Sequence, residues 1–313
     1  MRAVAISELG ATPAPMTLPV PEPGPGESRV KIIAAGLNPL DWKIADGVLK
    51  DSVAYHFPLV LGVDGAGVVD AVGEDAPFEV GDQVFGTFFG VPRGHGTYAE
   101  YTVATPDDAV IPMPEGMLYT EAAALPTPGM TAVTIIDAAD VESDRVILVV
   151  GATGGVGQPV VRLASRRGAT VVASARPDME DRMRDLGAAA IVDHGEGDLN
   201  AQVREHHPDG VDAIIDLVSD RTAAERLAAL LRPGGVYVST VWALNPDALE
   251  AQGVRGVNID YTPTPDLLRR ATELAENGDL EVGVEAEIPL EEAPAAIARS
   301  RAGGARGKTI IRP

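Results

Sequence analysis

The stretch VILVVGATGGVGQPVVRLASRRGATVVASARP, residues Val146 to Pro177, decides the fold of this chain. It begins with an apolar run typical of a buried strand, and Gly151, Gly154 and Gly157 then follow at a spacing of three. A helical segment and a second apolar run complete a stretch of about 30 residues. The pattern predicts one βαβ unit whose first turn is shaped by glycine.

The glycine turn indicates a dinucleotide site. A sharp turn from strand to helix, a close approach of the backbone to a pyrophosphate, and tight packing of the helix on the strand each leave no room for a side chain. The amino end of the following helix offers N–H groups and a positive dipole to phosphates. An ordinary tight turn is the alternative, but the βαβ context favours a dinucleotide. We therefore predict cofactor contacts along the whole turn, at Gly151, Ala152, Thr153, Gly154, Gly155, Val156 and Gly157.

The end of the second apolar run predicts which dinucleotide binds. A carboxylate about 20 residues beyond the glycines would accept hydrogen bonds from the ribose of NAD. Ser174 and Arg176 stand there instead, and a small polar residue beside an arginine leaves room for a 2′-phosphate. A solvated surface position is the alternative role of Arg176, and the nearby Asp178 weakens the local positive field. We expect NADPH as the cofactor.

Composition excludes several classes of protein. The chain has 313 residues, which favours two domains, and it has no cysteine, so disulfide scaffolds and thiolate chemistry are excluded. The formal net charge of −21 would repel nucleic acid and anionic membranes. No apolar run approaches the ~20 residues of a membrane helix. We expect a cytoplasmic protein that binds neither nucleic acid nor membrane.

The pattern of apolar runs and turn residues changes twice along the sequence. Residues 1–118 alternate short apolar runs, such as TYAEYTVAT, with Gly and Pro, which predicts an antiparallel β domain. Residues 119–262 alternate apolar runs with helical segments such as RTAAERLAALLRPGG, which predicts a doubly wound parallel sheet. Residues 263–313 return to mixed character, and Thr264 and Pro265 are placed to begin a helix that stops at Asn277 and Gly278.

Nine motifs, in order along almost the whole chain, carry a resemblance to a known family: AAGLNPLDWKIADG, PLVLGVDGAGVVDAVG, VGDQVFG, GTYAEYTV, EAAALPTPGMTA, GATGGVGQ, LRPGGVYV, PLEEAPAAI and ARGKTII. The chain resembles the zinc-independent branch of the medium-chain dehydrogenase/reductase superfamily, the quinone oxidoreductase (zeta-crystallin-like) group. The resemblance implies a mostly β GroES-like catalytic domain made of residues 1–118 and 263–313, with a Rossmann domain at 119–262 between them. It also implies a substrate in the intervening cleft and a homodimer.

The sequence departs from the zinc-dependent relatives at their metal ligands. In the alcohol dehydrogenase branch, a Cys and a His hold a catalytic zinc in the segments that match AAGLNPLD and LGVDGAG. Asn38 and Val63 stand in those segments here, with Asp64 next to Val63. The histidines, at positions 56, 95, 194, 206 and 207, show no spacing typical of ligands. We therefore expect no metal site.

A protein without zinc lacks the Lewis acid that a simple ketone or alcohol needs. Conjugated acceptors need less help, because a quinone that receives hydride becomes a phenolate-like anion that solvent can protonate, with a reference pKa of about 10. An enone becomes an enolate, for which a positioned donor is worth ~2–4 kcal/mol by analogy with oxyanion donors. The expected substrate is a small molecule with a conjugated carbonyl.

The segment LNPLDWK supplies the catalytic candidates. By resemblance, Asn38 and Asp41 lie beside the nicotinamide and the substrate, and Lys43 stands where the family often has Tyr or Lys. Lys43 would donate to the developing oxyanion, or else it is a solvated helix residue. Asn38 before Pro39 is also a common way to begin a turn. Two tyrosines could line the pocket, Tyr55 and Tyr98, and Tyr98 lies in a predicted strand, which favours a place in the core.

Further cofactor contacts are expected by position. In relatives, the region of Thr127 and Thr131 meets the cofactor, although capping a helix is a common role for threonine. Ligands of doubly wound sheets bind beyond the carboxyl ends of the strands. Val218 and Thr240 follow two predicted strands and are therefore candidates, with core packing as their alternative role.

Three functions remain open at this point. The first is an NADPH-dependent quinone reductase, which the missing zinc ligands favour. The second is an NADPH-dependent enone or enoyl reductase with Lys43 as the donor. The third is a non-catalytic NADPH-binding protein with a structural or regulatory role, since relatives include lens crystallins.

Overall fold

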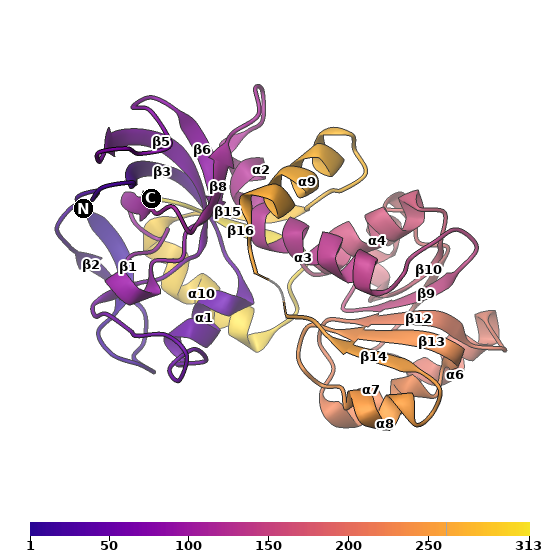
Figure 1. Ribbon diagram of the computed structural model, residues 1–313. Helices are drawn as coiled ribbons and strands as arrows, with labels where there is room; N and C mark the ends of the chain where they lie inside the picture. The colour runs from indigo at the N-terminus through magenta and orange to yellow at the C-terminus, as the bar shows by residue number, and fades with distance from the viewer. Residues whose placement is uncertain (261) are drawn as a thin grey trace. The chain divides into compact units, whose positions relative to one another are not determined.

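A computed structural model describes residues 1–260 and 262–313 (Figure 1). The chain forms two compact units. Unit 1 consists of Met1–Thr127, Pro263–Thr272 and Gly283–Pro313, and unit 2 consists of Pro128–Thr262 and Glu273–Val282. The predicted fold class is confirmed: one unit is mostly β and the other contains a parallel sheet with helices. The domain boundaries predicted from the sequence stay a prediction.

Unit 1 is built on two sheets. Its larger sheet has the order β15-β16-β3-β5-β6-β8, with β7 also paired to β3, and its smaller sheet has the order β2-β1-β4. Its strands are β1 (Arg2–Ile6), β2 (Ala14–Thr17), β3 (Ser28–Gly36), β4 (Leu59–Val60), β5 (Asp64–Val72), β6 (Gln83–Thr87), β7 (Tyr101–Ala104), β8 (Ala109–Pro112), β15 (Val284–Pro289) and β16 (Lys308–Arg312). Because β16 pairs with β3, the last residues of the chain complete a sheet that begins near its start.

Short helices cover parts of unit 1. They are α1 (Pro39–Ala45), α2 (Tyr119–Ala124) and α10 (Ala293–Ala302), together with the single turns η1 (Val91–Arg93) and η3 (Leu290–Glu292). The first half of β3 alternates as a half-buried strand does, with Val30 and Ile32 in the core and Lys31 exposed. Pairing of β3 with β5 and of β3 with β16 places the start of α1, which follows β3 directly, beside both neighbouring strands.

One predicted strand of unit 1 is shorter than its pattern. The run TYAEYTVAT was predicted as one strand, but β7 begins only at Tyr101. Tyr98 is wrongly placed in a strand by the sequence, because its N–H donates to Leu61 O and its carbonyl accepts from Val4 N–H, both outside β7. Its side chain is buried in the core, as the alternative role predicted. Hydrogen bonds from Tyr98 to distant residues therefore exclude it from β7, although the alternating sequence pattern would extend the strand to include it.

Unit 2 contains a six-stranded sheet in which all neighbouring strands are parallel. Its order is β11-β10-β9-β12-β13-β14, so the chain moves outward from β9 in one direction and then from β12 in the other. The strands are β9 (Val146–Val150), β10 (Thr170–Ser174), β11 (Ala190–Val192), β12 (Val211–Asp216), β13 (Leu231–Ser239) and β14 (Arg255–Asn258). The reversal of direction lies between β9 and β12, which is where such sheets bind nucleotides.

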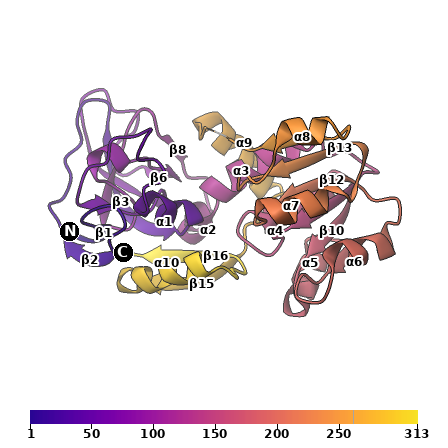
Figure 2. The same cartoon turned by 90° about the horizontal axis from the view of Figure 1, so that it is seen from below.

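Helices connect the parallel strands. They are α4 (Gly157–Arg166), α5 (Glu180–Asp185), α6 (Leu199–His206), α7 (Arg221–Ala228) and α8 (Pro246–Glu250), with the turn η2 (Pro177–Met179). Helix α4 lies on one side of the sheet, and α7 and α8 lie on the other (Figures 1 and 2). Both faces of the sheet are thus covered, which explains why its strands are apolar almost throughout. The helical pattern from Arg221 predicts a longer helix, but α7 ends at Ala228, because Leu231 already belongs to β13 and pairs with Val211.

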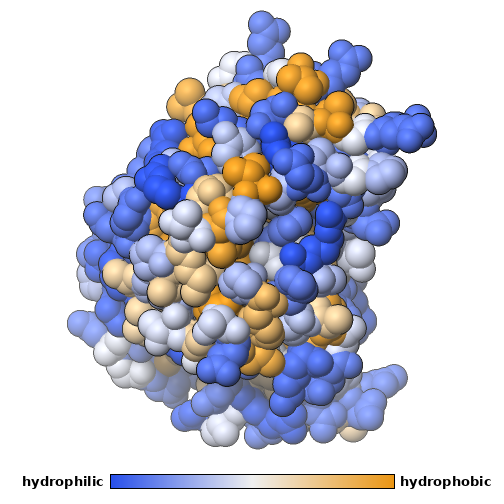
Figure 3. All heavy atoms as spheres, turned by 90° about the vertical axis from the view of Figure 1, so that its left-hand side faces the viewer, coloured by the Kyte–Doolittle hydropathy of each residue, from blue (hydrophilic) through white to orange (hydrophobic). Residues whose placement is uncertain are grey.

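Two helices carry residues of both units, α3 (Pro126–Ala138) and α9 (Pro265–Glu276). The beginning of α9 confirms the predicted cap, because the Thr264 hydroxyl accepts a hydrogen bond of 3.1 Å from Leu267 N–H. Pro265 is its first residue, and Gly278 follows its end with a φ of +72°. Among the described residues, no helix is long and apolar enough to cross a membrane. The face of the molecule on the left of Figure 1 is mostly hydrophilic, with small groups of apolar side chains among polar ones (Figure 3).

Candidate active site and cofactor-binding turn

The segment that follows β3 brings its polar residues into the interior of unit 1. Asn38 precedes α1 and Asp41 lies in its first turn, and only 2% and 1% of these residues are exposed. The Asn38 N–H donates to Asp41 Oδ2 at 2.7 Å, which closes the first turn of the helix. Pro39 fits the first helical position, because its missing N–H would have no partner there. The short helix thus fixes the spacing of the two polar side chains.

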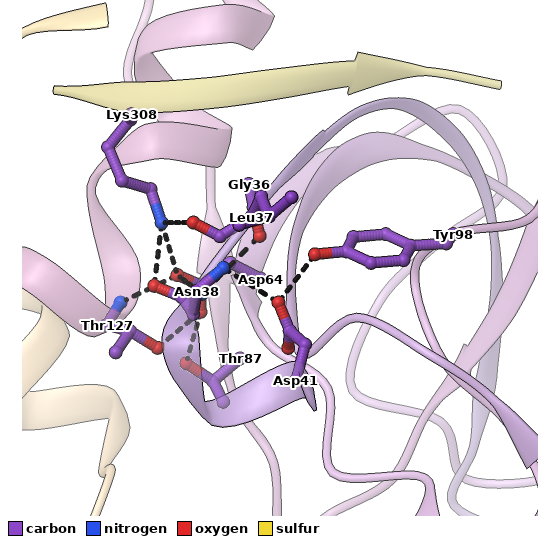
Figure 4. Close-up of polar contacts among 9 residues, drawn as sticks. All are labelled: Gly36, Leu37, Asn38, Asp41, Asp64, Thr87, Tyr98, Thr127 and Lys308. Atoms are coloured by element: carbon purple, nitrogen blue, oxygen red, sulfur yellow. Dashed lines mark hydrogen bonds and ion pairs between the residues drawn. The ribbon is translucent and has the colours of Figure 1, made fainter. Parts of the chain in front are cut away.

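Asp64 is the centre of a buried polar cluster, shown in Figure 4. It begins β5, is not exposed at all, and accepts four hydrogen bonds. Oδ2 accepts from Asn38 Nδ2 at 2.8 Å and from Thr127 N–H at 3.0 Å. Oδ1 accepts from the Thr127 hydroxyl at 2.7 Å and from the Thr87 hydroxyl at 3.2 Å. Four donors match the acceptor capacity of a carboxylate, so Asp64 is buried at a smaller free-energy cost than an unpaired charge.

Lys308 supplies the positive charge of this cluster. It begins β16, is 3% exposed, and lies with its Nζ 4.0 Å from Asp64 Oδ2. Its Nζ donates to Leu37 O and to Asn38 Oδ1, each at 2.6 Å. Burial raises the pKa of the Asp64 carboxyl and lowers the pKa of the Lys308 ammonium, while the attraction between the two charges opposes both shifts. The cluster formed by Asn38, Asp64, Thr87, Thr127 and Lys308 is called the Asp64 cluster below.

Asp41 lies beside the Asp64 cluster and has a separate partner. Its Oδ2 accepts from the Tyr98 hydroxyl at 2.5 Å, whereas its Oδ1 is buried without a hydrogen-bond partner among the residues described. Asp41 also lines a cavity of about 10 Å³, together with apolar residues and His95. Burial raises the pKa of Asp41 to about 7, although the hydrogen bonds from Tyr98 and from Asn38 N–H act in the opposite direction. Asp41 is therefore a buried acid that changes charge near neutral pH.

The side chain of Lys43 contacts an aromatic ring, whereas Asn38 and Asp41 take part in buried hydrogen bonds. It is half-buried, and its ammonium lies over the ring of Trp42, with 5.7 Å between Nζ and the ring centroid. The guanidinium of Arg301 also lies over the Trp42 ring, at 5.4 Å. Tyr55 is half-buried as well, and its hydroxyl donates to Ile44 O at 3.0 Å. The structure thus joins Asn38 and Asp41 by a hydrogen bond, and it shows Lys43 in a cation–π contact.

The glycine turn of unit 2 has the shape that a phosphate cradle requires. Gly151 follows β9 with a φ of +81°, a conformation that glycine adopts without strain. A Cβ on Gly157 would lie 2.3 Å from Gly151 O, so α4 can approach the turn only with glycine there. A Cβ on Gly154 would meet only Gly151 O, at 3.6 Å, which leaves one side of the backbone open. The residues of this turn fit a dinucleotide pyrophosphate at the amino end of α4.

A buried glutamine of α4 forms a hydrogen bond with the backbone of the turn. Gln158 in α4 is 1% exposed, and its Nε2 donates to Thr153 O at 2.9 Å. Its Oε1 accepts from Arg182 Nε at 3.0 Å. Ala152 is buried, while Thr153, Gly155 and Val156 are half-buried. These two hydrogen bonds connect the turn to α4 and to Arg182 in α5.

The other candidate cofactor residues lie near the carboxyl ends of the strands or in α3. Ser174 ends β10 and is 2% exposed, and its hydroxyl lies 3.3 Å from His194 Nδ1. Arg176 is exposed two residues further on. Val218 follows β12, and a Cβ on Gly151 would lie 2.9 Å from its Cγ1, so Val218 sits against the glycine turn. Thr240 follows β13 and its N–H donates to Asp216 O, whereas Thr131 is buried in α3.

The segments that match the zinc-binding segments of alcohol dehydrogenases carry other residues in this chain. The chain has no cysteine, and among the described residues no group of three or more His, Asp or Glu side chains could hold a metal ion. Asn38 and Val63 stand in the segments that carry zinc ligands in alcohol dehydrogenases, and the neighbouring Asp64 already accepts four hydrogen bonds. The matching segments therefore offer neither the Cys nor the His of that three-ligand zinc site.

Comparisons with known proteins agree with this architecture. The model of the alcohol dehydrogenase GroES-like domain matches residues 24–115, and a model described as zinc-binding dehydrogenase matches residues 186–311. The mitochondrial NAD(P)H oxidoreductase RTN4IP1 of Bos taurus is 30% identical over 328 aligned positions, which cover 92% of this chain and 82% of the relative. The chain belongs to the medium-chain dehydrogenase/reductase superfamily.

Within that superfamily, solved quinone oxidoreductases are among the structures similar to this chain. The quinone oxidoreductase from Coxiella burnetii is 27% identical, with a TM-score of 0.88 over 100% of this chain and 99% of the other. A mycobacterial protein solved as a complex with NADPH is 25% identical, with a TM-score of 0.87 over 100% of both chains. The predicted resemblance to quinone oxidoreductases is confirmed, and this medium-chain dehydrogenase/reductase is an oxidoreductase enzyme.

Sequence reasoning missed the centre of the polar cluster. It selected Asn38 and Thr127 but treated Asp64 only as the neighbour of Val63, and it counted Lys308 only as one lysine of four. A signal was present, because Asp64 and Lys308 each stand in an otherwise apolar or glycine-rich run, where a charge is buried only with a partner. Which charges pair could not be deduced from that signal.

Proposed function

We propose that this protein is an NADPH-dependent, zinc-independent oxidoreductase that transfers hydride to a quinone or a similar conjugated carbonyl acceptor. When bound, the nicotinamide would supply the hydride. The protein's own residues would hold the dinucleotide at the glycine turn and surround the acceptor with the polar segment that follows β3. The site assignments from the sequence, including Asn38, Asp41 and Thr127, are part of this proposal.

The observation that carries the proposal is that the candidate donors are already engaged inside unit 1. The two N–H groups of the Asn38 amide contact Asp64 Oδ2 at 2.8 Å and Gly36 O at 3.4 Å. The Thr127 hydroxyl donates to Asp64, and the Tyr98 hydroxyl donates to Asp41. These groups would have to give up a hydrogen bond to stabilise an oxyanion. An acceptor whose reduced form needs no dedicated donor, as a quinone does, therefore fits best.

The choice of NADPH rests on the end of β10. Ser174 stands where an acidic residue would bind the ribose of NAD, and the exposed Arg176 follows it. A guanidinium can form paired charge-assisted hydrogen bonds with a phosphate. The mycobacterial structure that was solved with NADPH supports the same choice, since its fold matches this chain over its whole length.

A steady-state assay with a panel of acceptors tests this function. Purified protein is given NADPH or NADH with quinones, enones and simple ketones, with and without a chelator, and its zinc content is measured. We expect turnover of quinones with NADPH that survives chelation, and no stoichiometric zinc. Loss of activity on chelation, or a preference for simple ketones, would contradict the proposal. No turnover with any acceptor, despite tight cofactor binding, would favour a structural role.

The variant Lys43→Met separates the quinone reductase from the enone reductase. Because the Lys43 ammonium lies over Trp42, we expect both activities to persist in this variant. A loss of enone reduction by more than about tenfold, which is ~1.4 kcal/mol of barrier, with quinone turnover intact would instead assign Lys43 as the donor. The exposed Lys50→Met is the matched control. A cytoplasmic location and a homodimer stay predictions, to be measured by cell fractionation and by sedimentation.

A further inference from the structure

Trp242 has an unusual backbone conformation and an unusual exposure. It lies three residues beyond the end of β13, its φ is +57°, and 60% of it is exposed. Among the residues that the structure describes, the other non-glycine residues with positive φ are Asp75, Asp140 and Asp144. Aspartate tolerates the left-handed region because its short side chain can bond locally, whereas a bulky aromatic residue is strained there. A strained and exposed tryptophan calls for a functional explanation.

Side-chain hydrogen bonds hold the backbone on both sides of Trp242. On the side of β13, the Ser239 hydroxyl accepts from Val241 N–H at 3.2 Å, and Ser239 is not exposed. On the other side, the Asn258 side chain binds Leu244 twice, from Leu244 N–H to Oδ1 at 3.2 Å and from Nδ2 to Leu244 O at 3.1 Å. These hydrogen bonds hold the chain on both sides of Trp242 and so oppose its relaxation into a common conformation.

The strand order of unit 2 predicts which part of a dinucleotide reaches Trp242. The pyrophosphate binds at the glycine turn after β9, and the two halves of such a sheet each bind one mononucleotide. Ser174 ends β10 and Arg176 follows it, so the proposed adenosine would lie over the β10 and β11 side. The nicotinamide must then extend the opposite way, over β12 and β13. Val218 after β12 is 64% exposed and sits against Gly151, which marks the beginning of that path.

From these observations we infer that the indole of Trp242 forms an aromatic wall against which the nicotinamide ring lies. Trp242 follows the carboxyl end of β13, which is the end of the sheet where the proposed nicotinamide would lie. Contact with the ring would offset the strain and the exposure of the indole. The inference rests on the proposed nicotinamide-dependent function. It assigns Trp242 to the nicotinamide ring, whereas Arg176 is assigned to the 2′-phosphate.

Fluorescence provides the direct test, because the chain has only two tryptophans, Trp42 and Trp242. The variant Trp42→Phe leaves Trp242 as the only tryptophan, and Trp242→Phe leaves Trp42, whose ring is in contact with Lys43 and Arg301. NADP⁺ should quench the emission of Trp42→Phe, since its nicotinamide is a cation that stacks on indole. The same nucleotide should leave the emission of Trp242→Phe nearly unchanged. Quenching of equal size in both variants, or in neither, overturns the inference.

Binding measurements separate a contact with the ring from a general structural role. Trp242→Ala should weaken NADP⁺ and NADH binding by about three- to tenfold, the range expected for one aromatic contact. Trp242→Phe should retain most of the affinity. Adenosine 2′,5′-bisphosphate carries the 2′-phosphate but no nicotinamide, so its affinity should not change in any of these variants. An equal loss for all ligands would show that the substitution disturbs the fold instead.

The remaining outcomes distinguish this inference from the proposed function. If the protein prefers NADH or reduces no quinone, the proposed function fails, but NADH still tests Trp242, because the nicotinamide is common to both nucleotides. If no nicotinamide nucleotide binds, both proposals fail. Trp242 could instead lie in a contact between two copies of this chain, and sedimentation of Trp242→Ala tests that alternative. A change of oligomeric state without any change in nucleotide affinity would assign Trp242 to that contact and overturn the inference.

Discussion

At the scale of single residues, hydrogen-bond capacity decides the chemistry of the candidate site. Asn38 accepts from a lysine, Nζ to Oδ1 at 2.6 Å, and donates to a carboxylate, Nδ2 to Asp64 Oδ2 at 2.8 Å. These two contacts fix the orientation of the amide, because a flipped amide would point its N–H groups at the Lys308 ammonium. Asn38 is therefore suited to shape the site, and this geometry opposes its use as a proton donor.

Asp41 gives the first prediction at this scale. Its pKa is raised to about 7 in the folded protein by burial, against about 3.9 in an unfolded chain. The folded state thus binds the proton more tightly, and this contribution to the free energy of unfolding is lost as the pH rises from about 4 through 7. Asp41→Asn removes the titration. We expect the variant to gain roughly 1–3 kcal/mol relative to the wild type between pH 5 and pH 8.

Chemical denaturation at several pH values measures the stability of the Asp41 variant. Asn at this position can still accept from Tyr98 and from Asn38 N–H, so the local hydrogen bonds persist. The exposed Asp107→Asn is the control and should follow the wild type at every pH. A constant difference between Asp41→Asn and the wild type over this range would show that Asp41 stays charged in the fold.

Arg176 gives the second residue-scale prediction. Arg176→Ala should weaken NADPH binding by about 2 kcal/mol or less, as expected for a charge-assisted contact at an exposed position, and leave NADH binding nearly unchanged. Titration calorimetry with both nucleotides measures the difference. Arg204→Ala, which removes an exposed arginine in α6, is a matched control. Equal losses for NADPH and NADH would show that Arg176 does not read the 2′-phosphate.

At the scale of elements, the turn between β9 and α4 joins folding to cofactor binding. Gly157→Ala would place a Cβ 2.3 Å from Gly151 O and 2.6 Å from Ala152 O, so the turn and the helix would have to move apart. We expect a loss of ~1–3 kcal/mol of stability, typical of overpacking, together with weaker nucleotide binding. Thermal unfolding and nucleotide titration of the same variant measure both effects.

Gly154→Ala is the matched variant for this element. Its Cβ would meet only Gly151 O, at 3.6 Å, which is ordinary van der Waals contact. Stability should therefore change by less than ~0.5 kcal/mol, as for most substitutions that create no close contact. The methyl group would nevertheless occupy the open side of the turn, and nucleotide affinity should fall by at least about tenfold, or ~1.4 kcal/mol. Unchanged affinity in Gly154→Ala would place the phosphates elsewhere.

The observed limits of β7 and α7 differ from those that the sequence patterns predict. Alternation predicted a strand through Tyr98, yet β7 begins at Tyr101, because Tyr98 bonds to β1 and to Leu61 instead. Helical spacing predicted a long helix after Asp220, yet α7 ends at Ala228, because Leu231 pairs with Val211. In both cases a local preference yields to a hydrogen bond with a distant strand. The helix start at Thr264 was predicted correctly, since a cap involves only neighbouring residues.

At the scale of the whole molecule, charge is kept mostly on the surface. The formal net charge is −21, and most ion pairs join exposed side chains, so each contributes little to stability. The Asp64 cluster differs from these pairs, because its carboxylate and its ammonium are both buried in unit 1. Breaking such a pair is far more costly than breaking a surface pair. The interior of unit 1 thus depends on a polar arrangement that composition does not reveal.

The sequence by itself determined the class of fold, the glycine turn and the family. Periodicity, glycine spacing and helix caps depend on neighbouring residues, so they can be read along the chain. Only the tertiary structure decided that Lys308 lies against Asn38, a residue 270 positions earlier, and that Asp64 accepts from both Thr87 and Thr127. The reason is that a buried charge takes its pKa and its partners from strands brought together by pairing, and no local pattern records which strands meet.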